Sequence, residues 1–449
     1  MTPSSSDRTA PPDLVDRLEE GTSRQPLTRN RGFELLWASE TISHLGSAVT
    51  LVALPLLAVV TLHASPLEVG LLVAAENLAW LLIGLPAGAW VDRWPKRTVA
   101  VATDWARAAL LTSIPVAALA GMLTMTQLYV VAVAVGVAGV FFAIAYQALL
   151  PSLVHPDDLV TANGRLQVSQ SAAMILGPGL GGGLVQLATA AGAIVLDALS
   201  FAVSALLLSR TRPRDRDGAR ATTPVKPARS ATVGKSTPRP PLRTEVSEGL
   251  RYVLGDRRLR ALTLCGAQFN FFVAAQQAVA VLFLVREVGL PAGWVGALLA
   301  TSGAGGILAA TFSGRLVARY GPGPTMTAAL TCGTALGLLI PLASPGAGIT
   351  LFAVGYAALS GGIVVVGVVF VSYRQSVCPP ALLGRMTATV RLFSWGALSV
   401  GGVAGGVLAQ FAGLRGALWA VAIGFALCPL WVFLGGARQL PTTPGQAAD

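Results

Sequence analysis

The stretch LEVGLLVAAENLAWLLIGLPAGAWVDRWPKR, residues 67–97, decides the class of protein to which this chain belongs. Its first part, 67–91, is almost wholly apolar and exceeds the ~20 residues that a helix needs to cross a bilayer. Glu76 lies near the middle, where a charged side chain costs roughly 2.5–3.5 kcal/mol on insertion scales. Such a carboxyl group is expected to face a polar cavity or a partner, which indicates a path for protons, ions or a polar solute.

The composition is that of a polytopic membrane protein. Of the 449 residues, 53% are hydrophobic and only 12% are charged, with a mean hydropathy of +0.66, whereas soluble domains carry about a quarter charged residues. The 50 Gly and 28 Pro suit the close contacts and kinks of membrane helices. The apolar runs predict an all-α membrane protein with twelve spanning helices, at 33–62, 67–91, 98–120, 126–150, 161–187, 190–210, 259–285, 292–317, 324–343, 347–373, 387–411 and 414–436.

The basic residues fix the expected orientation. If the N-terminus is cytoplasmic, all 32 Lys and Arg except Arg107, Arg286 and Arg415 fall on the inner side, as the positive-inside rule requires. Both termini and the central linker are therefore expected in the cytoplasm, with the protein in the inner or plasma membrane. Residues 1–31 are polar and lack the apolar core of a cleavable signal peptide.

A net charge of +11 and a pI near 10.2 raise the question of a nucleic-acid partner. Many of the basic residues, however, lie in or beside the linker at 211–258, which has no aromatic residue before Tyr252. Anionic lipid headgroups beside a cytoplasmic linker account for this charge. The expected partner is the lipid bilayer, and no nucleic acid.

The chain contains an internal repeat. Val69-Gly70 recurs as Val295-Gly296 and Gly88 recurs as Gly314, both 226 residues later. The predicted organisation is two six-helix bundles joined by a linker that ends in an amphipathic helix at 244–258. Its parts are a tail at 1–32, a bundle at 33–210, the linker at 211–258, a bundle at 259–437 and a tail at 438–449.

The loop after the second span reads Gly88-Ala-Trp-Val-Asp92-Arg93-Trp-Pro95-Lys96-Arg97. This loop and the twelve-span layout resemble the major facilitator superfamily over 30–437, although Pro95 replaces the usual Gly. The second copy, from Gly314 to Arg319 and Gly321, has Ala318 in place of the acid. The resemblance implies two six-helix bundles related by a pseudo-two-fold axis. It also implies that the first of the two loops is the functional copy of the motif.

The loop has a physical role of its own. Asp92 can meet the positive N-terminal end of a helix from the other half, where a carboxylate gains about 0.3–1 kcal/mol. Arg391, near the start of the eleventh span, is an additional partner. Such a contact would close the cytoplasmic side in one state and break in the other. The alternative is that the charges only anchor the loop on the inner side.

The fifth span carries Gly164, Ala173 and Gly177-Pro178-Gly179-Leu180-Gly181-Gly182. This spacing is similar to the antiporter signature of the superfamily, with Ala173 in place of one Gly, and it favours an exporter. Pro178 bends the helix, and the glycines allow a close contact with a neighbouring helix. An ordinary Gly-mediated helix contact is the alternative.

Two further stretches, 150–163 and 374–385, look like the drug-exporter group that includes macrolide-efflux and enterobactin-exporter proteins. The chain departs from many drug–proton antiporters at two places. Its fourth span lacks a membrane Arg, and Ser47 stands where an Asp is common in the first span. Proton coupling therefore cannot be carried over from those positions.

Five residues within apolar stretches are candidates for proton coupling, and none of the acids lies in the second half. Glu76 has no basic residue within a helical turn or two, so desolvation favours its neutral form and suits it to proton exchange. Asp104 and Arg107 are three apart and can pair, either for coupling or for structural neutralisation. Glu40 is a coupling residue or an interfacial one, and Asp197 resembles a position that is often acidic in this group.

Polar residues within the spans are candidates for lining a substrate cavity beside aromatic side chains such as Trp80. Such an amphipathic wall suits bulky, partly apolar ligands, although each aromatic ring could instead pack against lipid. The polar candidates are Gln147, Gln170, Gln268, Asn270 and Gln276.

Other chemistry is not indicated. Gly234-Lys235-Ser236 lacks the upstream Gly of a phosphate loop, the three histidines are scattered, and the four cysteines have no paired spacing. No enzyme activity, cofactor or metal is expected. The predicted protein is a monomeric exporter of small amphipathic compounds, such as antibiotics, driven by protons. A proton-coupled nutrient importer and a non-transporting membrane receptor are the alternatives.

Overall fold

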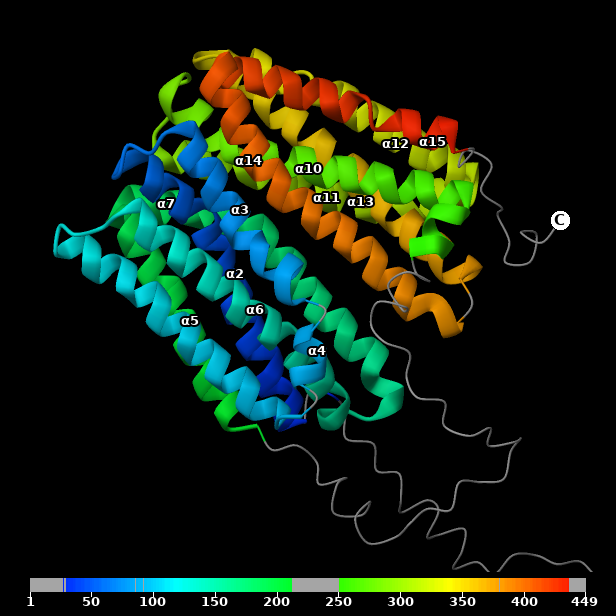
Figure 1. The fold of residues 1–449 in the computed structure, drawn as a ribbon, viewed down its shortest axis with the longest axis horizontal. Helices are drawn as coiled ribbons and strands as arrows, with labels where there is room; N and C mark the ends of the chain where they lie inside the picture. The colour runs from blue at the N-terminus through cyan, green and yellow to red at the C-terminus, as the bar shows by residue number, and fades with distance from the viewer. Residues whose placement is uncertain are drawn as a thin grey trace, which may run out of the picture.

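The computed structural model describes residues 27, 30–84, 86–91, 93–211, 250–378 and 380–435, and within these ranges every regular element is helical (Figure 1). Short 3-10 turns, η2, η3 and η4, connect some of the α-helices. The helices are α2 (Arg31–Val60), α3 (Pro66–Ile83), α4 (Pro86–Val91), α5 (Lys96–Leu119), α6 (Met125–Leu153), α7 (Leu159–Ser209), α10 (Arg257–Arg286), α11 (Ala292–Tyr320), α12 (Pro322–Gly337), α13 (Ile349–Val377), α14 (Pro380–Ala426) and α15 (Pro429–Leu434).

These helices account for the twelve predicted crossings. Nine helices in the described ranges are long and apolar enough to span a membrane. Two of them, α7 and α14, bend sharply at Thr189 and Gly413 and so cross twice, and α5 supplies one more span of 24 residues with several charges. Both bends have left-handed φ values, 71° and 75°, close to the predicted breaks in the apolar pattern. The all-α fold class is confirmed.

The internal repeat extends to the backbone of individual turns. After α2, the amide of Leu62 donates to Leu57 O, and after α10 the amide of Val288 donates to Phe283 O, in each case 226 residues apart. The residue that reverses the chain has a positive φ in both copies: His63 at 51° and Gly289 at 74°.

The two halves each form a helical group. In the first, α2 and α5 pack against α7, and α6 packs against α3 and α5; in the second, α10 packs against α14, and α13 against α11 and α12. Figure 1 shows that the groups meet where α3, α7 and α14 are labelled and diverge towards α4 and α15. Most of the predicted tails and linker lies outside the described residues, as do residues 244–249 of the amphipathic segment, whereas its residues 250–255 are helical and α10 follows from Arg257.

The halves meet chiefly along two seams, α3 against α14 and α7 against α11, and α10 also contacts α3 and α2. A Cβ added at Gly70 would lie 2.5 Å from Gly402 O, and one at Gly182 would lie 2.6 Å from the Cα of Gly296. Arg286 Nη2 also donates to Ala64 O across the halves, at 2.7 Å. These contacts lie at the end where α3 and α11 begin, which we call the closed end.

Towards the opposite end, which carries Arg93–Arg97 and which we call the basic end, the seams part. On the faces that continue the α7–α11 seam, the side chains of Val168 and Ile307 are 71% and 45% exposed. A Cβ at Gly164 or Gly314 would meet no described atom within 4 Å. The halves therefore touch from the closed end to about the middle of the molecule and are apart at the basic end.

The turn at Gly289 gives a first prediction. Gly289→Ala should lower the free energy of unfolding by roughly 1 kcal/mol, because an L-residue at φ 74° is strained although its Cβ would have space. Gly139→Ala is the matched control, since it also has space but lies within helix α6, where Ala is favoured. Thermal unfolding in detergent measures both, and equal effects would contradict the argument.

The α7–α11 seam gives a second prediction. A Cβ at Gly293 would lie 3.9 Å from the Cβ of Gln186, which is within the range of a disulfide bond. Cysteines at these two positions, in a chain with Cys332→Ser, should cross-link on mild oxidation. A protease site inserted between residues 211 and 250 reads out the link, because linked halves stay together after cleavage.

Two controls make this experiment specific to the seam. Gly182→Leu should prevent the cross-link by separating the helices, whereas Gly183→Leu should not, because a Cβ at Gly183 meets no described atom within 4 Å. Cysteines at Val168 and Ile307, towards the basic end, should not form a disulfide bond. If the cysteine pair near the basic end cross-linked as fast as the pair at the closed end, the arrangement of the halves would be refuted.

Candidate functional site

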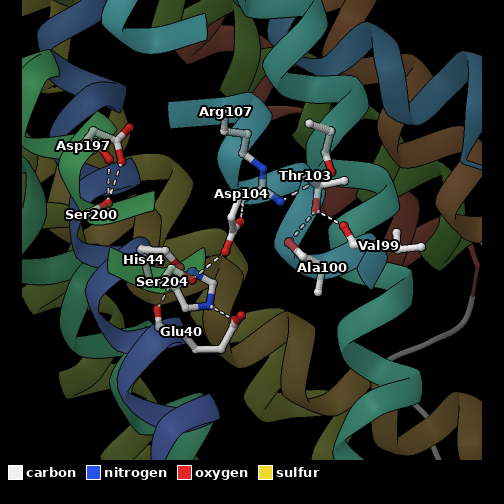
Figure 2. A network of polar contacts seen from close by, with 12 residues as sticks. Glu40, His44, Val99, Ala100, Thr103, Asp104, Arg107, Asp197, Ser200 and Ser204 are labelled. Carbon is white, nitrogen blue, oxygen red and sulfur yellow. Dashed lines mark hydrogen bonds and ion pairs between the residues drawn. The ribbon is translucent and has the colours of Figure 1, made fainter. Parts of the chain in front are cut away.

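A cluster of buried charged side chains lies inside the first half (Figure 2). It is built from α2, which supplies Glu40, from α5, which supplies Asp104 and Arg107, and from α7, which supplies Asp197. Their exposed fractions are 3%, 0%, 8% and 1%. The Asp104–Arg107 pair and two acids that the sequence offered separately are thus brought to one place, and Glu40 is buried within the protein.

Asp104 and Arg107 form the centre of the cluster. Arg107 Nη1 lies 3.7 Å from Asp104 Oδ1, as the three-residue spacing predicted. Ser204 Oγ donates a hydrogen bond of 2.6 Å to the other carboxyl oxygen of Asp104. The guanidinium lies over the rings of Phe142 and Phe201, with its carbon 4.5 and 4.8 Å from the ring centroids. Aromatic faces and one carboxylate thus replace water around this cation.

The other two acids flank this pair. Ser200 Oγ lies 3.2 Å from Asp197 Oδ1, and a Cβ at Gly46 of α2 would lie 2.5 Å from the same oxygen, so only glycine lets Asp197 approach α2. Glu40 Oε2 lies 3.1 Å from Nε2 of His44, one turn along α2. Both acids also interact electrostatically with Arg107.

Acid exceeds base in this cluster. Three carboxyl groups face one guanidinium, and His44 adds a positive charge only when it is protonated. Glu40 Oε1 has no hydrogen-bond partner among the described residues. Because buried, unpaired negative charge is costly, a bound proton stabilises the cluster. At 1.5 Å per residue, the acids lie roughly 12–18 Å along their helices from the basic end, within the membrane interior.

Glu76 lies apart from this cluster, on α3. It is partly exposed and has no hydrogen-bond or ion-pair partner among the residues that the structure describes. One turn further on, the indole of Trp80 stacks on that of Trp395 from α14, with centroids 4.8 Å apart and planes at 11°. This ring pair crosses from one half to the other.

The basic loop residues have several roles in the structure. Lys96 donates to Val91 O at 2.6 Å, and Arg97 donates to the carbonyls of Leu208 and Ser209, which satisfies the end of α7. Arg93 is exposed. Asp92 lies outside the described residues, so its contact with Arg391 stays a prediction.

On the second half, the corresponding residues are open at this end. Arg391 and Arg319 are exposed, and Arg319 lies over the ring of Tyr320. A Cβ at Gly88 or Gly314 would meet no described atom within 4 Å. The loop glycines therefore make no close helix contact among the described residues in this conformation.

The glycines of the fifth span contact two different helices. Gly177 lies against Ala48 of α2, and a Cβ at Gly181 would lie 3.0 Å from Val49 O, also on α2. Gly182 faces α11 of the other half, and Pro178 contributes its carbonyl to the contact with Gly296. Gly164, at the basic end, has no described neighbour within 4 Å of an added Cβ.

The polar candidates do not form one group. Gln268 donates to Gly424 O at 2.8 Å and accepts from Trp431 at 2.6 Å, so its side chain ties helices of the second half together. Asn270 bonds the carbonyl of Gly266 within its own helix. Gln147 is exposed, Gln170 is half-buried and Gln276 is buried.

Sequence reasoning missed the partners of the candidate residues. His44 and Ser200 lie one turn from an acid, and helical spacing would have paired His44 with Glu40 and Ser200 with Asp197. Ser204 and Trp395 meet partners 100 or more residues away, which no local pattern predicts.

Comparison with known proteins agrees with the fold. The chain is 28% identical over 417 residues to the uncharacterized MFS-type transporter YfiS of Bacillus subtilis (strain 168), covering 90% of this chain and 91% of the relative. It is 26% identical over 409 residues to the multidrug efflux pump Tap of Mycolicibacterium fortuitum, covering 88% and 93%.

Solved structures share the fold. The nucleoside transporter NupG superposes with a TM-score of 0.71 at 12% identity, over 91% of this chain and 98% of the other. A bacterial homologue of the iron transporter ferroportin in its inward-facing state gives 0.66 at 19% identity, over 92% and 100%. The family model of the Major Facilitator Superfamily matches residues 36–401. The chain therefore belongs to the major facilitator superfamily of membrane transporters.

Proposed function

We propose that this protein exports small amphipathic compounds, such as drugs, antibiotics or siderophore-like molecules, across the inner or plasma membrane in exchange for protons. The observation that carries the proposal is the buried cluster of Glu40, Asp104, Arg107 and Asp197. A cluster with more acid than base inside a membrane helix bundle is stabilised by binding a proton. It has no acidic counterpart in the apolar stretches of the second half.

Two observations support export over import. The glycine pattern of the fifth span is similar to the antiporter signature, and its Gly182 takes part in a contact between the halves. The relative Tap is a multidrug efflux pump of similar length. With the positive-inside orientation, the basic end, where the halves are apart, faces the cytoplasm, so a compound could enter between the halves from there.

Inside-out vesicles test the proposal. A drug-susceptibility panel in a pump-deficient host, with and without the gene, first identifies a compound. Vesicles with an acidified lumen should then accumulate that compound, and its entry should raise the lumenal pH as protons leave. An importer would not accumulate it under this gradient, and a non-transporting receptor would change neither quantity.

The Asp104–Arg107 pair gives a prediction that separates coupling from structure. Asp104→Asn leaves a buried guanidinium without its nearest acid and should destabilise the protein by about 3–5 kcal/mol. Asp104→Asn combined with Arg107→Gln removes both charges and should restore most of that stability. Proton-driven accumulation should stay near background in both variants, because the acid at the centre of the cluster can no longer bind or release a proton.

The control is Asp157→Asn, which removes an exposed carboxylate near the start of α7 and should leave accumulation unchanged. Thermal unfolding and vesicle accumulation are measured on the same preparations. If the double variant accumulates the compound as the unaltered protein does, the pair only neutralises charge and does not couple transport to protons.

A further inference from the structure

The stacked pair Trp80–Trp395 marks the point where the halves part along α3 and α14. Contacts run along this seam from Gly70 and Gly402 to Leu81, whose Cδ1 lies 3.5 Å from a Cβ added at Gly396. One turn beyond Trp395 towards the basic end, Arg391 is exposed and Leu392 is 37% exposed. The ring pair therefore lies at the inner end of the parted region.

Glu76 lies on the inward side of α3 next to this pair. Residues four apart are neighbours on a helix surface, so the Glu76 carboxyl and the Trp80 indole share one side. The lipid-facing side is marked by Leu71 and Leu82, which are 39% and 63% exposed. Both are more than 100° around the helix from Glu76, at about 100° per residue. Its partial exposure is thus towards the interior of the molecule.

The depth of this group is that of the bilayer centre. At 1.5 Å per residue, Trp80 lies roughly 21 Å from the start of α3, and Trp395 roughly 22 Å from the start of α14, which begins at the opposite end. Substrate sites of secondary transporters lie near this plane, between the two repeats.

The chemistry of the group selects positive charge. A carboxyl group without a partner attracts a cation when it is ionised, and a cation beside it favours that form; indole faces attract cations through their quadrupole. Arg391 is the nearest basic residue along α14, and it lies roughly 12 Å beyond the level of Glu76. We propose that Trp80, Trp395 and Glu76 form a binding site for apolar organic cations. The proposal rests on the proposed function and names its substrate class.

Binding to the purified protein tests this site without any transport. Tetraphenylphosphonium is an apolar cation, and tetraphenylborate has nearly the same shape with the opposite charge. Equilibrium dialysis should show tighter binding of the cation. Glu76→Gln and Trp395→Leu should each weaken cation binding about tenfold, whereas Trp395→Phe keeps a ring and should retain most of it.

Trp294→Leu is the matched control, because it removes a tryptophan that is 58% exposed on α11, and it should leave binding unchanged. Thermal unfolding verifies that each variant is folded. Cation binding by Glu76→Gln and Trp395→Leu at the affinity of the unaltered protein would overturn the site. Equal binding of both ions, with equal losses, would do so as well.

The two proposals fail in different ways. Cation binding that depends on Glu76, together with no accumulation in vesicles, would overturn export alone. Accumulation of a compound by a protein that has no preference for the cation would overturn this site alone.

Discussion

Direct contact between helix backbones holds the two halves together. At Gly70 and Gly402, and again at Gly182 and Gly296, the backbones approach so closely that a single methyl group would separate them. In a bilayer, helix association depends on such packing, because lipid tails are as apolar as the side chains they contact. The remaining arrangement follows, since the same helices diverge beyond these contacts and leave the region around Trp80 and Trp395 partly exposed.

The two halves are alike in backbone and unlike in charge. The turns at His63 and Gly289 have matching hydrogen bonds 226 residues apart, and α7 and α14 bend at left-handed residues. Among the described residues, the buried acids nevertheless all belong to the first half. The matching stretches of the second half are tied by neutral contacts such as Gln268 with Trp431. The two halves therefore share a backbone plan and differ in where buried charge is placed.

The sequence predicted the fold because each crossing is encoded locally, by apolar length and by breaks such as the one before Leu414. The Asp104–Arg107 pair was equally local, since three-residue spacing places both on one helix face. The assembly of that pair with Glu40 and Asp197 was not predictable, because three helices have to pack before their side chains meet. No local sequence pattern indicated Trp395 as a candidate site residue, since its stacking partner lies on a helix of the other half.

The bond from Arg286 to Ala64 has a consequence for how sequences of this kind can change over time. Its acceptor is a main-chain oxygen, which is present whatever side chain occupies position 64. Substitutions in that turn therefore leave the acceptor in place, whereas the donor depends on the side chain at position 286. Divergence at this contact is one-sided, because the bond constrains the side chain at position 286 and not the one at position 64.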